Sequence, residues 1–236
     1  YSGYLVSTDP PYYDNIGYSD LSDFFYIWLR RSLRSIHPQL LSTMLVPKTE
    51  ELVANPYRHG GRSGAHQFFE DGFRKVFFKA RESAFTDLPI TVYYAFKQSE
   101  ATAVGESSTG WETLLEGMIR SGWAVTATWP VRSELGNRMI GSGTNALASS
   151  IVLALRPRPL LAPSTDRREF VEALKAELPQ ALKELQHGAI APVDLPQAAI
   201  GPGMAVFSRY STVLEPDGSK MSVRSALARI NQILDQ

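Results

Sequence analysis

The stretch YLVSTDPPY, residues 4–12, carries the strongest structural signal in the chain. Residues 4–6 are apolar and predict a short buried strand. Asp9 and two consecutive prolines follow, and proline ends a strand because it cannot donate to a sheet ladder and restricts the residue before it. An aromatic residue, Tyr12, comes directly after the prolines. The stretch therefore predicts a strand that stops at a turn rich in hydrogen-bond acceptors, followed by a ring.

The groups in this turn suit a planar amino group. An ionised Asp9 accepts hydrogen bonds only, so it can hold one amino hydrogen. Pro10 and Pro11 remove two backbone donors and leave the Pro10 carbonyl to accept from a ligand. Tyr12 offers a ring that can stack on a flat heterocycle. Asp, Pro and Tyr are also common in ordinary turns, so the flanking sequence has to decide between the two interpretations.

Helical and strand patterns alternate after this turn. Ser19 or Asp20 is the expected N-cap of the first helix, and Gly122 is expected to close the third. Residues 41–65, with their prolines and glycines, predict a long irregular loop. Helices are expected over residues 19–34, 66–84 and 109–121, and strands over residues 90–96, 123–129 and 150–155. The apolar face expected for the second helix comprises Phe69, Phe73, Val76, Phe77 and Ala80.

This order of elements predicts an α/β domain with a mainly parallel sheet and helices on both faces. We divide the chain into residues 1–158, which carry the sheet, and a small, mainly helical extension over residues 159–236. The boundary is the proline-rich stretch RPRPLLAP. The extension is expected to hold a helix over residues 166–186, a Gly-Pro-Gly turn at 201–203, and a final helix from about Ser222.

Composition narrows the class of protein. The 236 residues are 44% hydrophobic and 20% charged, which suffices for one sizeable core. Without cysteine the chain can form no disulfide, thiolate nucleophile or cysteine zinc site. The 24 basic and 24 acidic residues give no net charge, so DNA would have to bind to a local stripe of basic residues. No run of residues is long and apolar enough to cross a bilayer, and a cytoplasmic location is expected. No His–carboxylate pattern suggests a metal site.

Residues 9–12 resemble the catalytic motif of the S-adenosylmethionine-dependent amino-methyltransferases, which methylate adenine N6 or cytosine N4 in DNA. The stretches DPPYYDNIGYSDLSDFFYIWLRRSL, WPVRSE and NALASSIVLALRPR resemble one subgroup more closely. That subgroup is the large adenine-specific DNA methylases that carry an N-terminal domain of unknown function. The similarity covers most of the chain and is most specific in residues 4–34 and 123–158.

The resemblance implies the C-terminal half of a Rossmann-like methyltransferase sheet. The strands would be the fourth to seventh of that fold, with the last one antiparallel in a closing hairpin. The first three strands would lie upstream of Tyr1, and the missing N-terminal half of the same protein is an expected partner.

The function implied is site-specific adenine-N6 methylation of DNA, with S-adenosylmethionine as cofactor. The methyl group would pass directly to the exocyclic amine of a flipped base. Asp9 and the Pro10 carbonyl would orient the amine, Pro11 would complete the motif, and Tyr12 would stack on the base. Two alternatives stay open: a related enzyme acting on cytosine N4, RNA or protein, and a non-catalytic nucleic-acid-binding or assembly module.

Further substrate contacts are expected in three places, each with a plainer interpretation. Tyr13 and Asn15 follow the motif and would touch the base, or they are loop residues. Trp129 and Arg132 end a predicted strand and would wall the pocket and bind phosphate, or they are a core residue and a surface charge. Residues with positive charge in the long loop would bind DNA phosphate or remain solvated. These loop candidates are Arg58 and Arg62, together with Lys48 and His59.

Residues 141–144, Gly-Ser-Gly-Thr, resemble the glycine turn that holds the cofactor in these enzymes. Such a turn follows a strand and opens a helix. Here polar residues precede it and a predicted strand follows, so a hairpin loop is the preferred interpretation. The residues that bind the cofactor are therefore not identified in this chain.

Overall fold

A computed structural model describes residues 4–11, 13, 16–94, 109–132, 149–187 and 195–234. The chain divides into two compact units. The sheet unit comprises Tyr1–Pro10 and Phe73–Gln236, and the helical unit comprises Pro11–Gly72. The chain passes from one unit to the other between Pro10 and Pro11, and again within helix α2 (Arg62–Glu82).

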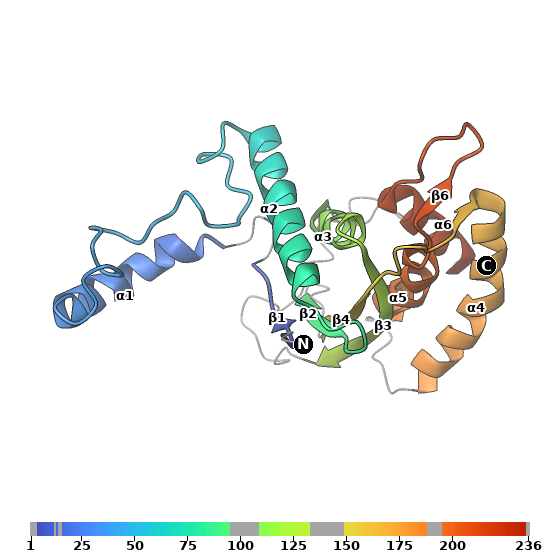
Figure 1. Cartoon of the computed structure of the whole chain (residues 1–236), viewed down its shortest axis with the longest axis horizontal. Coiled ribbons are helices and arrows are strands. Elements are labelled where there is room, and N and C mark those ends of the chain that lie inside the picture. Colours follow the sequence, from blue (N-terminus) through green and yellow to red (C-terminus); the bar gives the residue numbers. More distant parts are fainter. Residues whose placement is uncertain are drawn as a thin grey trace, which may run out of the picture. The chain divides into compact units, whose positions relative to one another are not determined.

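The sheet unit is built on a mixed four-stranded sheet (Figure 1). Its strands are β1 (Ser7–Thr8), β2 (Ile90–Tyr94), β3 (Trp123–Arg132) and β4 (Ser149–Pro157), in the order β1-β2-β4-β3. Strands β1 and β2 are parallel, whereas β4 is antiparallel to both β2 and β3. The α/β class and the antiparallel last strand are confirmed. Strands β1, β2 and β3 run in the same direction, as a mainly parallel sheet requires, and only β4, which returns between β2 and β3, runs against them.

Strand β1 begins later than the apolar run suggested. Tyr4 makes only an isolated bridge with Ala84, and Val6 accepts a hydrogen bond from the Thr91 amide at 3.0 Å. Tyr4 and Leu5 are each 71% exposed, so the prediction that residues 4–6 are buried is wrong for these two. The strand ends at Thr8, directly before Asp9, where the prolines predicted its end.

Helix α3 (Thr109–Arg120) and the last turns of α2 contribute to the core beside the sheet. Phe73 and Phe77 of α2 are buried as expected, and the indole of Trp123 donates to the Phe77 carbonyl at 2.9 Å. Val76 was expected on the same apolar face but is 56% exposed. Gly122 ends α3 with a φ of 82°, which confirms the predicted glycine closure.

The C-terminal part forms its own small layer in the sheet unit. It contains β5 (Ser164–Asp166), α4 (Arg167–His187), α5 (Leu195–Ser208), β6 (Thr212–Leu214) and α6 (Val223–Leu234), whose helices are labelled in Figure 1. Strand β5 pairs with β6 in parallel. The predicted turn at residues 201–203 is wrong, because these residues lie inside α5. Close packing explains both glycines there: a Cβ on Gly201 would overlap the Thr128 side chain, and one on Gly203 would lie 2.6 Å from Ile230.

This C-terminal layer is attached directly to the sheet. Helix α5 packs along β3, and the Ser208 hydroxyl accepts from the Val125 amide at 2.8 Å where the β3–β4 register shifts. The half-buried guanidinium of Arg158 donates to the carbonyls of Ile119, Ser208 and Tyr210. The proline-rich stretch predicted as the boundary between the two parts thus contains an anchoring residue.

The helical unit consists of α1 (Tyr18–Leu33), an irregular segment and the first turns of α2. Helix α1 begins after Gly17 without a side-chain cap, so the predicted capping by Ser19 or Asp20 is wrong. Glu51 explains this, because its carboxylate accepts from both the amide (2.8 Å) and the hydroxyl (2.5 Å) of Ser19. Within the described residues, no helix has the length and apolar character needed to cross a membrane.

Candidate functional site

Asp9 and Pro10 directly follow β1, at the carboxyl end of the parallel β1–β2 pair. The last paired residue, Thr8, lies opposite Val92 of β2. In open α/β sheets, ligands bind beyond the carboxyl ends of the strands. The sequence places an acceptor-rich turn at that edge, and the local fold keeps it there because the paired strand stops one residue earlier.

The Asp9 side chain is exposed but not fully hydrated. Partial burial raises the pKa of its carboxyl above the ordinary value, because desolvation disfavours the charged form. Pro10 and Pro11 are partly buried. The predicted stacking residue Tyr12 and the predicted contact Asn15 lie outside the described residues.

Tyr13 is packed against α2 within the helical unit. Its hydroxyl lies 3.0 Å from Nδ1 of His66, and its ring meets the Phe69 ring edge-on at 5.0 Å between centroids. The Tyr13 carbonyl accepts from the Ala54 amide at 2.7 Å. Tyr13, which was predicted to touch the base or to be a loop residue, is therefore an anchored side chain.

Arg58 belongs to an ion-pair network that joins α1 to the irregular segment. Its guanidinium lies 2.6 Å from Glu51 and 2.5 Å from Asp20, and the side chain is only 16% exposed. The hydrogen bond that Arg58 donates to Glu51 raises the pKa of Arg58 further above its already high value. Arg58 was a candidate for phosphate contact, but here its charge is compensated by two carboxylates.

The same network holds Lys48. Its ammonium lies 2.7 Å from Asp23, whose other oxygen accepts from the Val46 amide at 2.9 Å. The hydrogen bonds from Lys48 and Val46 lower the pKa of Asp23. Desolvation alone would raise the pKa of Glu51, but hydrogen bonds from Ser19 and Arg58 outweigh it and lower this pKa too.

The two remaining basic candidates of the loop, Arg62 and His59, have other surroundings. Arg62 is exposed at the first residue of α2. The His59 ring stacks on Phe68 at 3.8 Å between centroids. The structure therefore brings Arg58 and Lys48 into one network but does not add Arg62 to it.

The predicted contacts at the end of β3 are only partly described. Trp129 lies on β3 with 52% of its surface exposed, so the interpretation as a core residue is wrong. Arg132 is the last residue of β3, and its side chain is not described. The glycine stretch at residues 141–144 lies outside the described residues.

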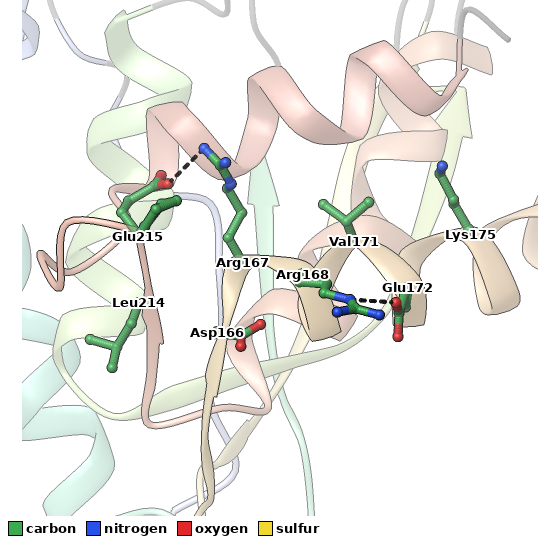
Figure 2. Close-up of a pocket in the computed structure, with 9 residues that line it drawn as sticks. Asp166, Arg167, Arg168, Val171, Glu172, Lys175, Leu214 and Glu215 are labelled. Atoms are coloured by element: carbon green, nitrogen blue, oxygen red, sulfur yellow. Dashed lines mark hydrogen bonds and ion pairs between the residues drawn. The ribbon is translucent and has the colours of Figure 1, made fainter.

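A separate hollow of about 500 Å³ lies between the start of α4 and the end of β6, and Figure 2 shows the side chains that line it. Its charged side chains largely pair with one another: Arg167 with Glu215 at 3.4 Å, and Arg168 with Glu172 at 3.1 Å. None of the predicted site residues lines it. In the described part of the chain, no group of three or more His, Cys, Asp or Glu side chains is arranged to hold a metal ion.

Sequence reasoning missed His66 and Glu70. Nε2 of His66 lies 3.2 Å from the Glu70 carboxylate, one turn further along α2. The i,i+4 spacing is visible in the sequence, but it is common on exposed helix faces. Only the approach of Tyr13, 53 residues away from His66, distinguishes this pair.

Comparisons with protein-family models, curated proteins and solved structures found no match to this chain.

Proposed function

We propose that this chain carries the base-binding side of an S-adenosylmethionine-dependent DNA amino-methyltransferase, with adenine N6 as the target. The observation that carries the proposal is the position of Asp9 and Pro10. They directly follow a parallel strand, at the sheet edge where open α/β folds bind ligands.

The strand arrangement supports the same proposal. In chain order, β1, β2, β3 and β4 would be the fourth to seventh strands of a Rossmann-like methyltransferase sheet. The last of them, β4, is antiparallel to its neighbours and forms a hairpin partner of β3. An unrelated fold could share four strands, so the sheet supports the proposal less strongly than the motif.

The proposed chemistry depends on two acceptors. The exocyclic amine of adenine is a poor nucleophile because its lone pair is delocalised into the ring. Hydrogen bonds from the amine to the Asp9 carboxylate and the Pro10 carbonyl favour a pyramidal nitrogen whose lone pair is free. The same acceptors stabilise the positive charge that develops as the nitrogen–carbon bond forms and the carbon–sulfur bond breaks. The methylated nitrogen would then release one proton to solvent and remain as a neutral methylamino group on the base.

Tyr12 is proposed as the stacking surface for the extruded base, a contact worth about 1–3 kcal/mol. S-adenosylmethionine supplies an electrophilic methyl group on a sulfonium. We assign no residue to the binding of this cofactor, since residues 141–144 lie outside the described part. Calorimetric titration of the chain with S-adenosylmethionine tests whether it binds the cofactor by itself.

Replacement of Asp9 tests the proposal. In an active protein that contains this chain, Asp9→Ala should lower methyl transfer to DNA by about 10²–10³-fold, the effect of losing one preorganised group. Because Asp9 is exposed, the free energy of unfolding should change by no more than about 0.5 kcal/mol. Tyr57→Phe, at a side chain that is 98% exposed, is the control and should keep the wild-type rate.

Radiolabelled methyl incorporation into DNA, RNA and protein, with mapping of the modified base, identifies the substrate. Incorporation of the radiolabelled methyl group at cytosine N4, in RNA or in protein would support an amino-methyltransferase with a different substrate. DNA binding without any transfer, in wild type and in Asp9→Ala alike, would refute the enzyme and leave a binding module.

A further inference from the structure

Tyr13, His66 and Glu70 form a continuous chain of side-chain contacts in the helical unit. The Tyr13 hydroxyl lies 3.0 Å from Nδ1 of His66, and Nε2 of the same ring lies 3.2 Å from Oε1 of Glu70. All three belong to Pro11–Gly72, so the contacts lie within one compact unit. These three residues are distinct from Asp9 and Pro10, the proposed acceptors, and from Tyr12, the proposed stacking residue.

The chemistry of the three groups sets the direction of the hydrogen bonds. A carboxylate only accepts, so Nε2 of His66 carries the hydrogen that faces Glu70. In a neutral imidazole the other nitrogen is then an acceptor, so the Tyr13 hydroxyl donates to Nδ1. Glu70 thus selects the tautomer of His66 that can receive Tyr13.

Tyr13 is also held by its ring and its backbone. The ring packs edge-on against Phe69, which is fully buried. The Tyr13 carbonyl accepts from the amide of Ala54, a residue that is 3% exposed. A partly exposed His–Glu pair one helical turn apart contributes little to stability by itself. Its structural value here is the link to a residue 53 positions earlier in the chain.

We propose that Tyr13, His66 and Glu70 form a clamp that fixes residue 13, directly after the motif, and so limits how far Tyr12, the last residue of the motif, can move. Tyr13 is a positioning residue and makes no contact with the base. The consequence for catalysis rests on the proposed methyltransferase function, whereas the clamp itself does not. Such a limit matters because a misplacement of about 1 Å can cost about 10²-fold in rate.

The test uses four matched variants. Tyr13→Phe removes the hydroxyl and keeps the ring. His66→Gln keeps a donor that can reach Glu70 but no acceptor at the Nδ1 position, whereas His66→Asn keeps an acceptor near Nδ1. Tyr57→Phe removes an identical hydroxyl from an exposed side chain of the same unit.

The first readout is hydrogen exchange at the Ala54 amide, measured on this chain without substrate. Tyr13→Phe and His66→Gln should each speed this exchange by about 3- to 10-fold, the factor that corresponds to one net hydrogen bond. His66→Asn and Tyr57→Phe should stay within about twofold of wild type. Wild-type exchange in Tyr13→Phe would overturn the clamp.

The second readout separates positioning from direct contact. In a protein with methyl-transfer activity, Tyr13→Phe should lower kcat by about 3- to 10-fold and leave KM for DNA within about twofold. A raised KM with unchanged kcat would overturn the positioning role and make Tyr13 a substrate contact. If the wild-type protein transfers no methyl group at all, the proposed function fails, and the exchange measurement still decides on the clamp.

Discussion

At the scale of single residues, the ionisation of Asp9 is the property most directly linked to the proposed chemistry. The carboxyl is partly desolvated, which raises its pKa. An acceptor for an amine works best as a carboxylate, because the negative charge opposes the positive charge that develops on nitrogen. Because the pKa is raised, Asp9 becomes protonated at a higher pH than an ordinary Asp. Activity should therefore begin to fall at a higher pH on acidification.

We expect the acid limb of the pH profile of kcat/KM to have its midpoint above the ordinary value for Asp, about 3.9. Asp9→Asn should remove this limb and leave a low rate that does not depend on pH in that range. Measuring initial rates on a fixed DNA substrate tests this, with circular dichroism at each pH to verify folding. A midpoint at or below the ordinary value would contradict a desolvated Asp9.

At the scale of elements, the attachment of α1 to the irregular segment depends on carboxylates. Asp23 and Glu51 both have a lowered pKa, for the reasons given above. Lowered values mean that their stabilising contribution is fully present above the ordinary pKa of a carboxyl group. It is lost as pH falls through the lower, folded-state pKa. Helix α1 should therefore detach at acid pH and remain attached at neutral pH.

The amide of Val46 reports on this directly, because it donates to the Asp23 carboxylate. We expect its proton chemical shift to titrate with a midpoint below the ordinary Asp value of about 3.9. Lys48→Met should raise that midpoint, since it removes the ammonium that lies 2.7 Å from Asp23. A wild-type midpoint at the ordinary value, unchanged by Lys48→Met, would show that the ion pair does not persist in solution.

Helix α1 carries large apolar side chains on its exposed surface as well as on its buried face. Tyr26 is its buried large apolar side chain, while Leu21, Phe24 and Trp28 are each more than half exposed. Their spacing of three and four residues places them along one helix face. This periodicity explains why the sequence predicts the helix correctly, whereas its start depends on the distant carboxylate of Glu51.

At the scale of the whole sheet unit, the C-terminal layer is held to β3 by close contact as well as by hydrogen bonds. Gly201 of α5 lies so near Thr128 of β3 that no Cβ fits between them. Gly117 of α3 is different, because its nearest neighbour, Phe73, would lie at an ordinary contact distance of 3.6 Å. The two glycines offer a matched pair of helical positions.

Gly201→Ala should lower the free energy of unfolding by about 1–3 kcal/mol, because α5 has to move away from the sheet. Gly117→Ala should be neutral or stabilise by up to about 1 kcal/mol, since alanine favours the helix. Urea unfolding of both variants measures the difference. Equal stability of the two variants would mean that α5 does not pack on β3 as described.

The sequence by itself determined the local elements and the candidate chemistry. Apolar periodicity, the two prolines at residues 10 and 11, and Gly122 act over a few neighbouring residues, so they correctly located the strand end, most helices and the closure of α3. The acceptors in residues 9–11 are likewise a local property of the chain.

Only the tertiary structure decided which distant residues meet. Glu51 replaces a helix cap at Ser19, the close approach of Thr128 requires glycine at position 201, and His66 receives the hydroxyl of Tyr13. Each of these contacts joins residues more than 30 positions apart. Short-range patterns contain no information about such pairs, because close packing and hydrogen bonding between them depend on how the elements are arranged in space.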